Sequence, residues 1–119
     1  MATWEELAEA LADYALQCNG NERLRKMQRD WSRTLHFSCL DNDVTFTMVV
    51  DHGEITEVSA DHVGDPDITV AASSEVFCDM FWGDLNPVQK YLAGEITVHG
   101  SQEDVMRLDA ISAIIWPDG

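Results

Sequence analysis

The stretch that most constrains the fold of this chain reads WGDLNPVQKYLAGEITVHGS and spans residues 82–101. Gly83 can adopt the left-handed backbone conformation that ends a helix, because glycine has no side chain to clash there. Asn86 supplies a capping side chain, and Pro87 has a φ angle that already suits the first turn of a helix. A short helix is therefore expected from Pro87 to Gly94, followed by a strand in which apolar and polar residues alternate.

The order and spacing of these residues resemble the signature of the sterol carrier protein 2 (SCP-2) family of lipid-transfer domains. That signature consists of a glycine, a short link to Asn-Pro, an aromatic residue, a glycine, a strand and a further glycine. In this sequence its positions are Gly83, Asn86, Pro87, Tyr91, Gly94, the strand Glu95 to His99, and Gly100. An unrelated α/β protein with two short helices before a strand is the alternative that the residues leave open.

The resemblance implies an α+β fold with a five-stranded, mostly antiparallel (mixed) sheet whose last two strands join the first. It also implies helices packed on one face of that sheet, with an apolar cavity for a lipid tail between them. A carrier is implied, and not an enzyme. One residue departs from the family: Lys90 stands where a small residue is common, which would narrow or re-aim the mouth of the cavity.

Hydrophobic periodicity in the rest of the chain agrees with this fold. Thr3 and Glu6 can form a capping box at the first helix, and Asn21 can cap the second. The first helix is expected over residues 4–17, and the second follows Asn21 with Leu24, Met27 and Trp31 on one face. Strands are expected over 34–39, 44–50, 55–59 and 68–71. Ser73 or Ser74 should cap the next helix, and a last helix should run from a Ser101–Asp104 capping box to Trp116-Pro117. A chain of this length builds one core, so residues 1–119 are expected to form a single domain.

The first three strands are expected to form a sheet that is covered on one side only. Apolar residues occupy one face of each strand, as Leu35 and Phe37 do in the first. Polar residues on the other face are expected to contact water. These residues are Thr34, His36, Ser38, Thr45 and Thr47.

Composition limits the partners and the compartment. The 119 residues include 22 acidic and 7 basic side chains, and the formal charge of −15 opposes contact with nucleic-acid phosphates. The N-terminal helix is acidic and amphipathic, and no apolar run approaches the roughly 18 residues of a membrane span. We therefore expect a cytoplasmic protein that binds no nucleic acid.

Most of the basic residues are concentrated around the second expected helix. Arg23, Arg25, Lys26 and Arg29, with Arg33 just beyond, form an electropositive patch in an otherwise acidic chain. The first four predict transient contact with an anionic membrane surface or head group. A solvated helix face, neutralised by nearby acidic loops, is the alternative interpretation.

The sequence shows no spacing that favours catalysis or metal binding. It contains no nucleophile with an adjacent base, no Gly-rich phosphate loop and no GxSxG motif. The 3 cysteines are widely spaced, which favours reduced thiols over a disulfide framework or a CxxC site. The histidines lie in separate strands and loops, so no metal or other cofactor is expected. They are His36, His52, His62 and His99.

The predicted function is the binding, and in a carrier also the transfer, of a lipid or another elongated hydrophobic ligand between sheet and helices. Aromatic and methionine side chains suit a pocket that must adapt to varied apolar shapes. The residues expected to line the pocket are Phe46, Met48, Phe77, Met80, Phe81, Leu85, Val88, Tyr91, Leu92, Ile111 and Ile115. Each of them could equally fill a closed core, except that the hydroxyl of Tyr91 needs a polar partner and could orient a ligand head group.

The alternative function is a structural or assembly module that holds no ligand. Such a module would form a homodimer through an exposed Trp82 or Trp116, or would dock on a partner enzyme. A carrier should retain lipid through purification, whereas an assembly module should come out empty and larger than one chain in solution.

Overall fold

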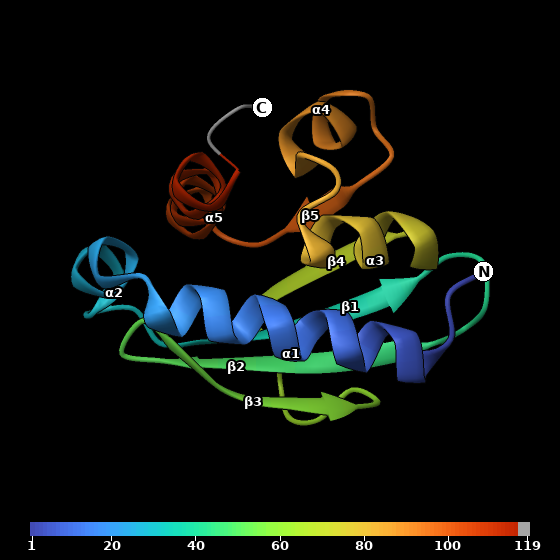
Figure 1. Ribbon diagram of the computed structural model, residues 1–119, viewed down its shortest axis with the longest axis horizontal. Helices are drawn as coiled ribbons and strands as arrows, with labels where there is room; N and C mark the ends of the chain where they lie inside the picture. Colours follow the sequence, from blue (N-terminus) through green and yellow to red (C-terminus); the bar gives the residue numbers. More distant parts are fainter. Residues whose placement is uncertain (117–119) are drawn as a thin grey trace.

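The computed structural model describes residues 1–116 and contains a single five-stranded sheet with five helices in that range (Figure 1). In chain order the elements are α1 (Trp4–Gly20), α2 (Glu22–Gln28), β1 (Arg33–Cys39), β2 (Thr45–Asp51), β3 (Glu54–Ala60), β4 (Ile68–Ala72), α3 (Ser74–Trp82), α4 (Pro87–Leu92), β5 (Thr97–His99) and α5 (Gln102–Ile115).

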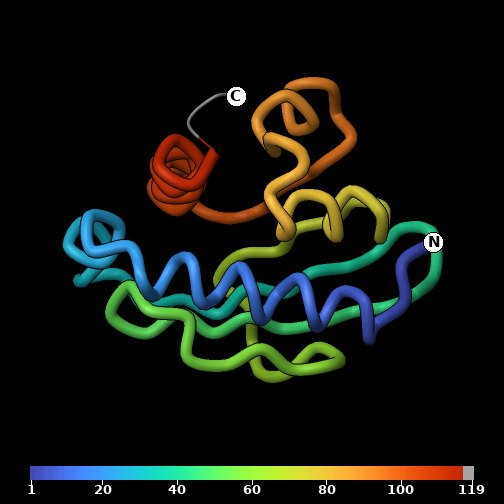
Figure 2. Tube along the Cα trace, viewed as in Figure 1, coloured from blue at the N-terminus to red at the C-terminus, as the bar shows by residue number. Residues whose placement is uncertain are grey.

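The sheet is mixed, with the strand order β3-β2-β1-β4-β5. β1 is central: it pairs antiparallel with β2 and parallel with β4, and β5 pairs antiparallel with β4. The last two strands thus join the first, as the signature stretch implied. Figure 1 shows the helices gathered over one face of the sheet, and Figure 2 shows α2 and α5, distant in the sequence, side by side. The predicted α+β fold is confirmed.

The helix caps predicted from the sequence are present at α1 and α2, but α1 is longer than predicted. Thr3 and Glu6 form the capping box, and Asn21 caps α2 by accepting from the Leu24 backbone N–H at 3.0 Å. The helix was expected to end at Gln17 and instead continues to Gly20. The side chain of Asn19 explains the extra turn, because its amide donates to the carbonyl of Ile55 and its oxygen accepts from the Ile55 N–H, both at 2.9 Å.

Trp31 does not belong to the second helix, contrary to the prediction. It lies between α2 and β1, and its buried indole N–H donates to the carboxylate of Asp104 at 3.0 Å. Arg33 Nε donates to the same oxygen at 2.9 Å, while Ser101 Oγ accepts from the Asp104 backbone N–H. Burial alone would raise the pKa of Asp104, but the hydrogen bonds from Trp31, Arg33 and Ser101 together lower it below its usual value. The first turn of α5 is therefore tied to the start of β1.

The outer face of the sheet is not fully exposed, contrary to the prediction. Thr47 is 1% exposed and His36 is 7% exposed, because the loop after β3 runs across them. Thr47 Oγ1 donates to the carbonyl of Asp61 and accepts from the Val63 N–H, both at 2.8 Å. The ring of His62 stacks on that of His36 with 4.2 Å between centroids. Thr34, Ser38 and Thr45 are half-buried.

The signature stretch forms the expected connections. Gly83 and Gly94 follow α3 and α4 with φ angles of 88° and 81°, in the left-handed region. Asn86 Oδ1 caps α4 by accepting from the Val88 N–H at 2.8 Å. The Asn86 amide donates to the carbonyl of Trp116 at 2.9 Å, which ties the start of α4 to the end of α5.

Gly53 and Gly94 offer a matched test of backbone strain. Both have positive φ, at 80° and 81°. A Cβ at Gly94 would meet open space, whereas one at Gly53 would lie 2.6 Å from the Gln28 carbonyl oxygen. Gly94→Ala should lower the free energy of unfolding by about 1–2 kcal/mol through strain alone. Gly53→Ala should lower it by clearly more, as measured by urea denaturation. Equal losses would contradict the close approach of Gln28 to Gly53.

The Asp104 contacts can be tested with Asp104→Asn. An amide leaves Arg33 and Trp31 with a weaker acceptor, and we expect a loss of about 2 kcal/mol in unfolding free energy, in the range for hydrogen bonds to charged groups. Asp30→Asn is the matched control, because Asp30 also pairs with an arginine of the protein, Arg107 at 3.1 Å, but its side chain is 70% exposed. Little change is expected there. A similar effect of both substitutions would show that burial of Asp104 contributes nothing.

Candidate functional site

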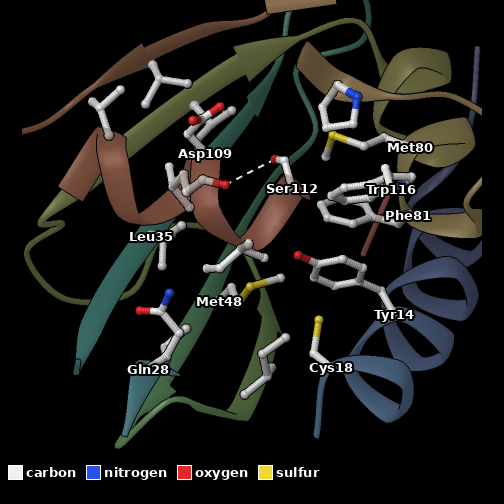
Figure 3. A pocket seen from close by; sticks show the side chains of 18 of the residues that line it. Tyr14, Cys18, Gln28, Leu35, Met48, Met80, Phe81, Asp109, Ser112 and Trp116 are labelled. Atoms are coloured by element: carbon white, nitrogen blue, oxygen red, sulfur yellow. Dashed lines mark hydrogen bonds between the residues drawn. The ribbon is translucent and has the colours of Figure 1, made fainter. Parts of the chain in front are cut away.

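A cavity of about 360 Å³ lies between the sheet and the helices (Figure 3). Its floor is formed by apolar side chains of the three central strands. Leu35 and Phe37 of β1 lie opposite Met48 of β2 and Val70 of β4, respectively, in the strand register. The alternation that places these residues on one face of the sheet thus gives the cavity a continuous apolar floor.

The walls are contributed by the helices. α1 supplies Tyr14 and Cys18, α3 supplies Met80 and Phe81, and α4 and α5 close the remaining side. The lining residues from α4 and α5 are Pro87, Val88, Tyr91, Val105, Met106, Leu108, Asp109, Ile111 and Ser112, with Trp116 just beyond α5.

These last two helices are not packed as core helices. α4 has no buried residue, and Asp104 is the buried residue of α5. The apolar side chains Val105, Leu108 and Ile111 face the cavity and stay half-buried. Apolar surface of this kind has no protein partner across the cavity, and a bound apolar molecule would cover it.

Six of the residues named from the sequence line this cavity. They are Met48, Met80, Phe81, Val88, Tyr91 and Ile111. These residues come from β2, α3, α4 and α5, so the fold does bring together side chains that are far apart in the chain. Their contact with a ligand stays a prediction.

The other five named residues lie outside the cavity. Phe46 and Phe77 are fully buried, and their rings pack against that of Phe37 with centroids 4.7 and 5.5 Å away. They fill the part of the core beneath α1 and α3 and leave no room for a ligand there. Leu92 is 78% exposed on α4. Leu85 and Ile115 pack against the edge of the core instead.

Several lining residues were not predicted from the sequence, and among them are the polar or amphipathic residues Tyr14, Gln28 and Trp116. Tyr14 belongs to the inward stripe of α1, but periodicity does not tell which part of a stripe faces a cavity. Trp116 was expected to be exposed and is half-buried against Tyr14, with 5.7 Å between ring centroids and 17° between ring planes. Gln28, 2% exposed, accepts from Arg107 Nη1 at 3.0 Å.

Burial disfavours the charged forms of two groups at the cavity wall, Tyr14 and Cys18. Burial raises the pKa of Tyr14 well above its usual value, and raises the pKa of the Cys18 thiol to about 11. Figure 3 shows Tyr14, Phe81 and Trp116 together on one side of the cavity and Gln28 on another. The indole nitrogen of Trp116 is buried and has no hydrogen-bond partner within residues 1–116. The cavity itself can enclose an apolar chain.

The arrangement gives no support for a reaction centre. Within the described residues no group of three or more His, Cys, Asp or Glu side chains is placed to hold a metal ion. Burial also raises the pKa of Cys78, which disfavours a reactive thiolate. His36 and His62 stack on the outer face of the sheet, away from the cavity. No helix among residues 1–116 is long and apolar enough to cross a bilayer.

Solved structures similar to this chain share its fold along most of its length. The "UbiJ-SCP2 Ubiquinone synthesis protein" is 17% identical, with a TM-score of 0.69, over 92% of this chain and 94% of that one. The sterol carrier protein domain 2 of Helicoverpa armigera is 21% identical, with a TM-score of 0.66, over 98% and 94%. Palmitated SCP2L2 from Aedes aegypti is 18% identical, with a TM-score of 0.62, over 96% and 95%.

Comparison with proteins of curated function gave no match. The model of the SCP-2 sterol transfer family matches residues 13–112, which include the cavity floor, the signature stretch and most of α5. The residues of the signature, the strand order and the family model agree, and the chain belongs to the SCP-2 sterol transfer family.

Proposed function

We propose that this protein binds a lipid or another elongated hydrophobic molecule in the cavity between its sheet and helices, and passes it to an acceptor without chemical change. The observation that carries the proposal is the apolar cavity beneath two helices whose inward side chains are only half-buried. Its volume of about 360 Å³ lies within the range of small-molecule sites, roughly 300–1,000 Å³.

Two of the similar solved structures support this proposal. One is a sterol carrier domain, and another is described as palmitated. Burial of each methylene of such a chain is worth about 0.8 kcal/mol, so a cavity lined by apolar side chains gains affinity with every carbon that it encloses. Side chains of two methionines, Met48 and Met80, can adjust to chains of different shape.

The assembly alternative is not favoured, because a module that only packs on a partner gains nothing from a hollow interior. Trp82 remains 42% exposed and could still contact a second chain. Homodimer formation and a cytoplasmic location stay predictions.

Membrane contact through the basic patch also stays a proposal. Arg23 and Arg29 are exposed, as the proposal requires. Arg25 pairs with Glu54 at 3.0 Å, and Lys26 with Glu22 at 3.1 Å, so these two cations are partly neutralised within the protein.

The proposal can be tested by extracting natively purified protein with organic solvent and analysing the extract by mass spectrometry. We expect lipid in near-stoichiometric amount, together with a matching excess mass in native mass spectrometry of the intact complex. Eluate depleted of the protein is the control, and it should contain little of the same lipid. Protein that comes out empty, and that takes up no added lipid afterwards, would rule out a carrier.

A matched pair of substitutions on α5 tests the place of binding. Ile111 lines the cavity, while Ile115, one turn later, does not. Ile111→Trp should occupy space that a ligand chain needs, and should weaken long-chain lipid binding by about tenfold, the equivalent of one or two methylenes excluded. Ile115→Trp should leave binding near that of the unmodified protein. Affinities can be measured by displacement of a fluorescent lipid, with thermal unfolding as a check on folding. Equal effects of the two substitutions would place the ligand elsewhere.

A further inference from the structure

A second hollow lies at the protein surface along the seam between α2 and α5. Its lining comes from both helices and from Asp30, which follows α2. Two of its residues, Gln28 and Met106, also line the cavity between sheet and helices. The cavity and the surface therefore approach each other here, and the side chains of the seam separate them.

We propose that a lipid enters and leaves the cavity between α2 and α5, through a gate formed by the side chains of Met27, Met106 and Arg107, and that Arg107 keeps this gate closed. The inference rests on the proposed function. It assigns a route and a rate-controlling residue to the same cavity.

Arg107 of α5 crosses the seam and bonds the end of α2. Its Nη1 donates to Gln28 Oε1 at 3.0 Å and to Asp30 Oδ1 at 3.1 Å, and its Nη2 donates to Asp30 Oδ2 at 3.3 Å. The Met27 carbonyl, one of those that the last turn of α2 leaves free, lies 3.5 Å from Nη1. Because Gln28 is 2% exposed and the Asp30 side chain is 70% exposed, a single guanidinium joins the cavity wall to the surface.

The bonds of Arg107 are suited to frequent opening. The hydrogen bond from Arg107 lowers the pKa of Asp30, so this ion pair is charged at neutral pH. Water screens the pair, because one partner is exposed, and such pairs contribute little to stability. Arg107 can therefore release α2 at a small cost in free energy while the fold persists.

The other side chains of the gate are flexible, and the backbones beside them are fixed. Met27 is 43% exposed and Met106 is 65% exposed, so packing does not hold either side chain in place. Methionine is unbranched and has several rotatable bonds. Trp31, just after α2, donates to Asp104 of α5 at 3.0 Å and holds the two segments together. The gate can thus open by rotation of side chains, without separation of the helices.

The gap between α4 and α5 is the competing route, because Tyr91 lines the cavity and is 43% exposed. The ends of these helices are tied more firmly. The carbonyl of Trp116 accepts from the Asn86 amide at 2.9 Å, and the Trp116 ring stacks on Tyr14. Lys90, expected from the sequence at the cavity mouth, does not line the cavity and pairs with Glu95 at 3.1 Å.

Rates of lipid exchange test the proposal. Release of bound cis-parinaric acid can be followed by stopped-flow fluorescence after mixing with excess phosphatidylcholine vesicles, and uptake by mixing the probe with empty protein. In the variant Arg107→Gln, release and uptake should both accelerate by about three- to tenfold, the factor for one hydrogen bond that no longer opposes opening. The equilibrium affinity should change little, because an open gate speeds both directions.

The matched control is Lys90→Gln, which breaks an ion pair of the same length, 3.1 Å, on the α4 side of the cavity. It should leave both rates unchanged. Equal acceleration by Lys90→Gln would place the route between α4 and α5. Faster release with unchanged uptake in Arg107→Gln would make Arg107 part of the binding site, and it would overturn the role as a gate.

Asp30→Asn is a second variant, which keeps the bond from Arg107 to Gln28 and is expected to preserve stability. It should accelerate exchange by less than Arg107→Gln does. The double variant should be no faster than Arg107→Gln alone, because both substitutions act on one interaction. Additive effects on the rates would contradict a shared gate. Thermal unfolding of each variant checks that it is folded.

Salt provides a readout in the unmodified protein. Sodium chloride screens the pair of Arg107 with Asp30, so the release rate should rise with salt concentration in the unmodified protein. The rise should be clearly smaller in Arg107→Gln, which lacks the pair. The same salt dependence in both proteins would contradict the role of Arg107.

Failure of this inference differs from failure of the proposed function. If cis-parinaric acid binds and its exchange rates do not respond to Arg107→Gln, the protein is a carrier whose ligand takes another route. If neither this probe nor any other lipid binds, the carrier proposal itself fails, and the inference fails with it.

Discussion

The interior of this protein depends on how α5 is held above the sheet. At its first turn, Asp104 accepts hydrogen bonds from Trp31 and Arg33, and just after its last turn the carbonyl of Trp116 accepts from Asn86. Because these polar attachments are directional and lie at the two ends, they set the height of the helix independently of its apolar face. The apolar residues between them are only half-buried, and the cavity lies between this helix and the sheet.

A second, filled region makes this arrangement stable. Beneath α1 and α3, the rings of Phe37, Phe46, Phe77 and Phe81 pack at centroid distances of 4.7–6.3 Å, a continuous aromatic cluster. Such packing supplies much of the burial that a domain of this size requires. The part of the sheet beneath α1 and α3 is thus covered by a dense core, and the part beneath α4 and α5 can remain hollow. Phe37 and Phe81 belong to both regions, since they also line the cavity.

The sequence was sufficient for the local features and for the class of site, but not for the boundary of the cavity. Caps such as Asn86 act over two or three residues, so a single sequence predicts them well. Phe46 and Met48 occupy alternate positions of β2 and therefore lie on the same face of the sheet, yet Phe46 fills the core and Met48 lines the cavity. That difference follows from the position of α5, which the contact of Trp31 with Asp104 sets across 73 residues of chain. No local sequence pattern predicts a contact between residues so far apart in the chain.

A cavity lowers the stability of a small domain, and a ligand that fills the cavity raises that stability again. The walls of an apolar void lose packing contacts, at about 24 cal/mol for each Å³ in large-to-small substitutions of protein cores. A molecule that fills the space restores those contacts. Because such a ligand binds the folded chain and not the unfolded one, its binding free energy adds to stability by mass action. In this protein, then, the feature that weakens the empty fold is the same feature that gives a bound lipid its affinity.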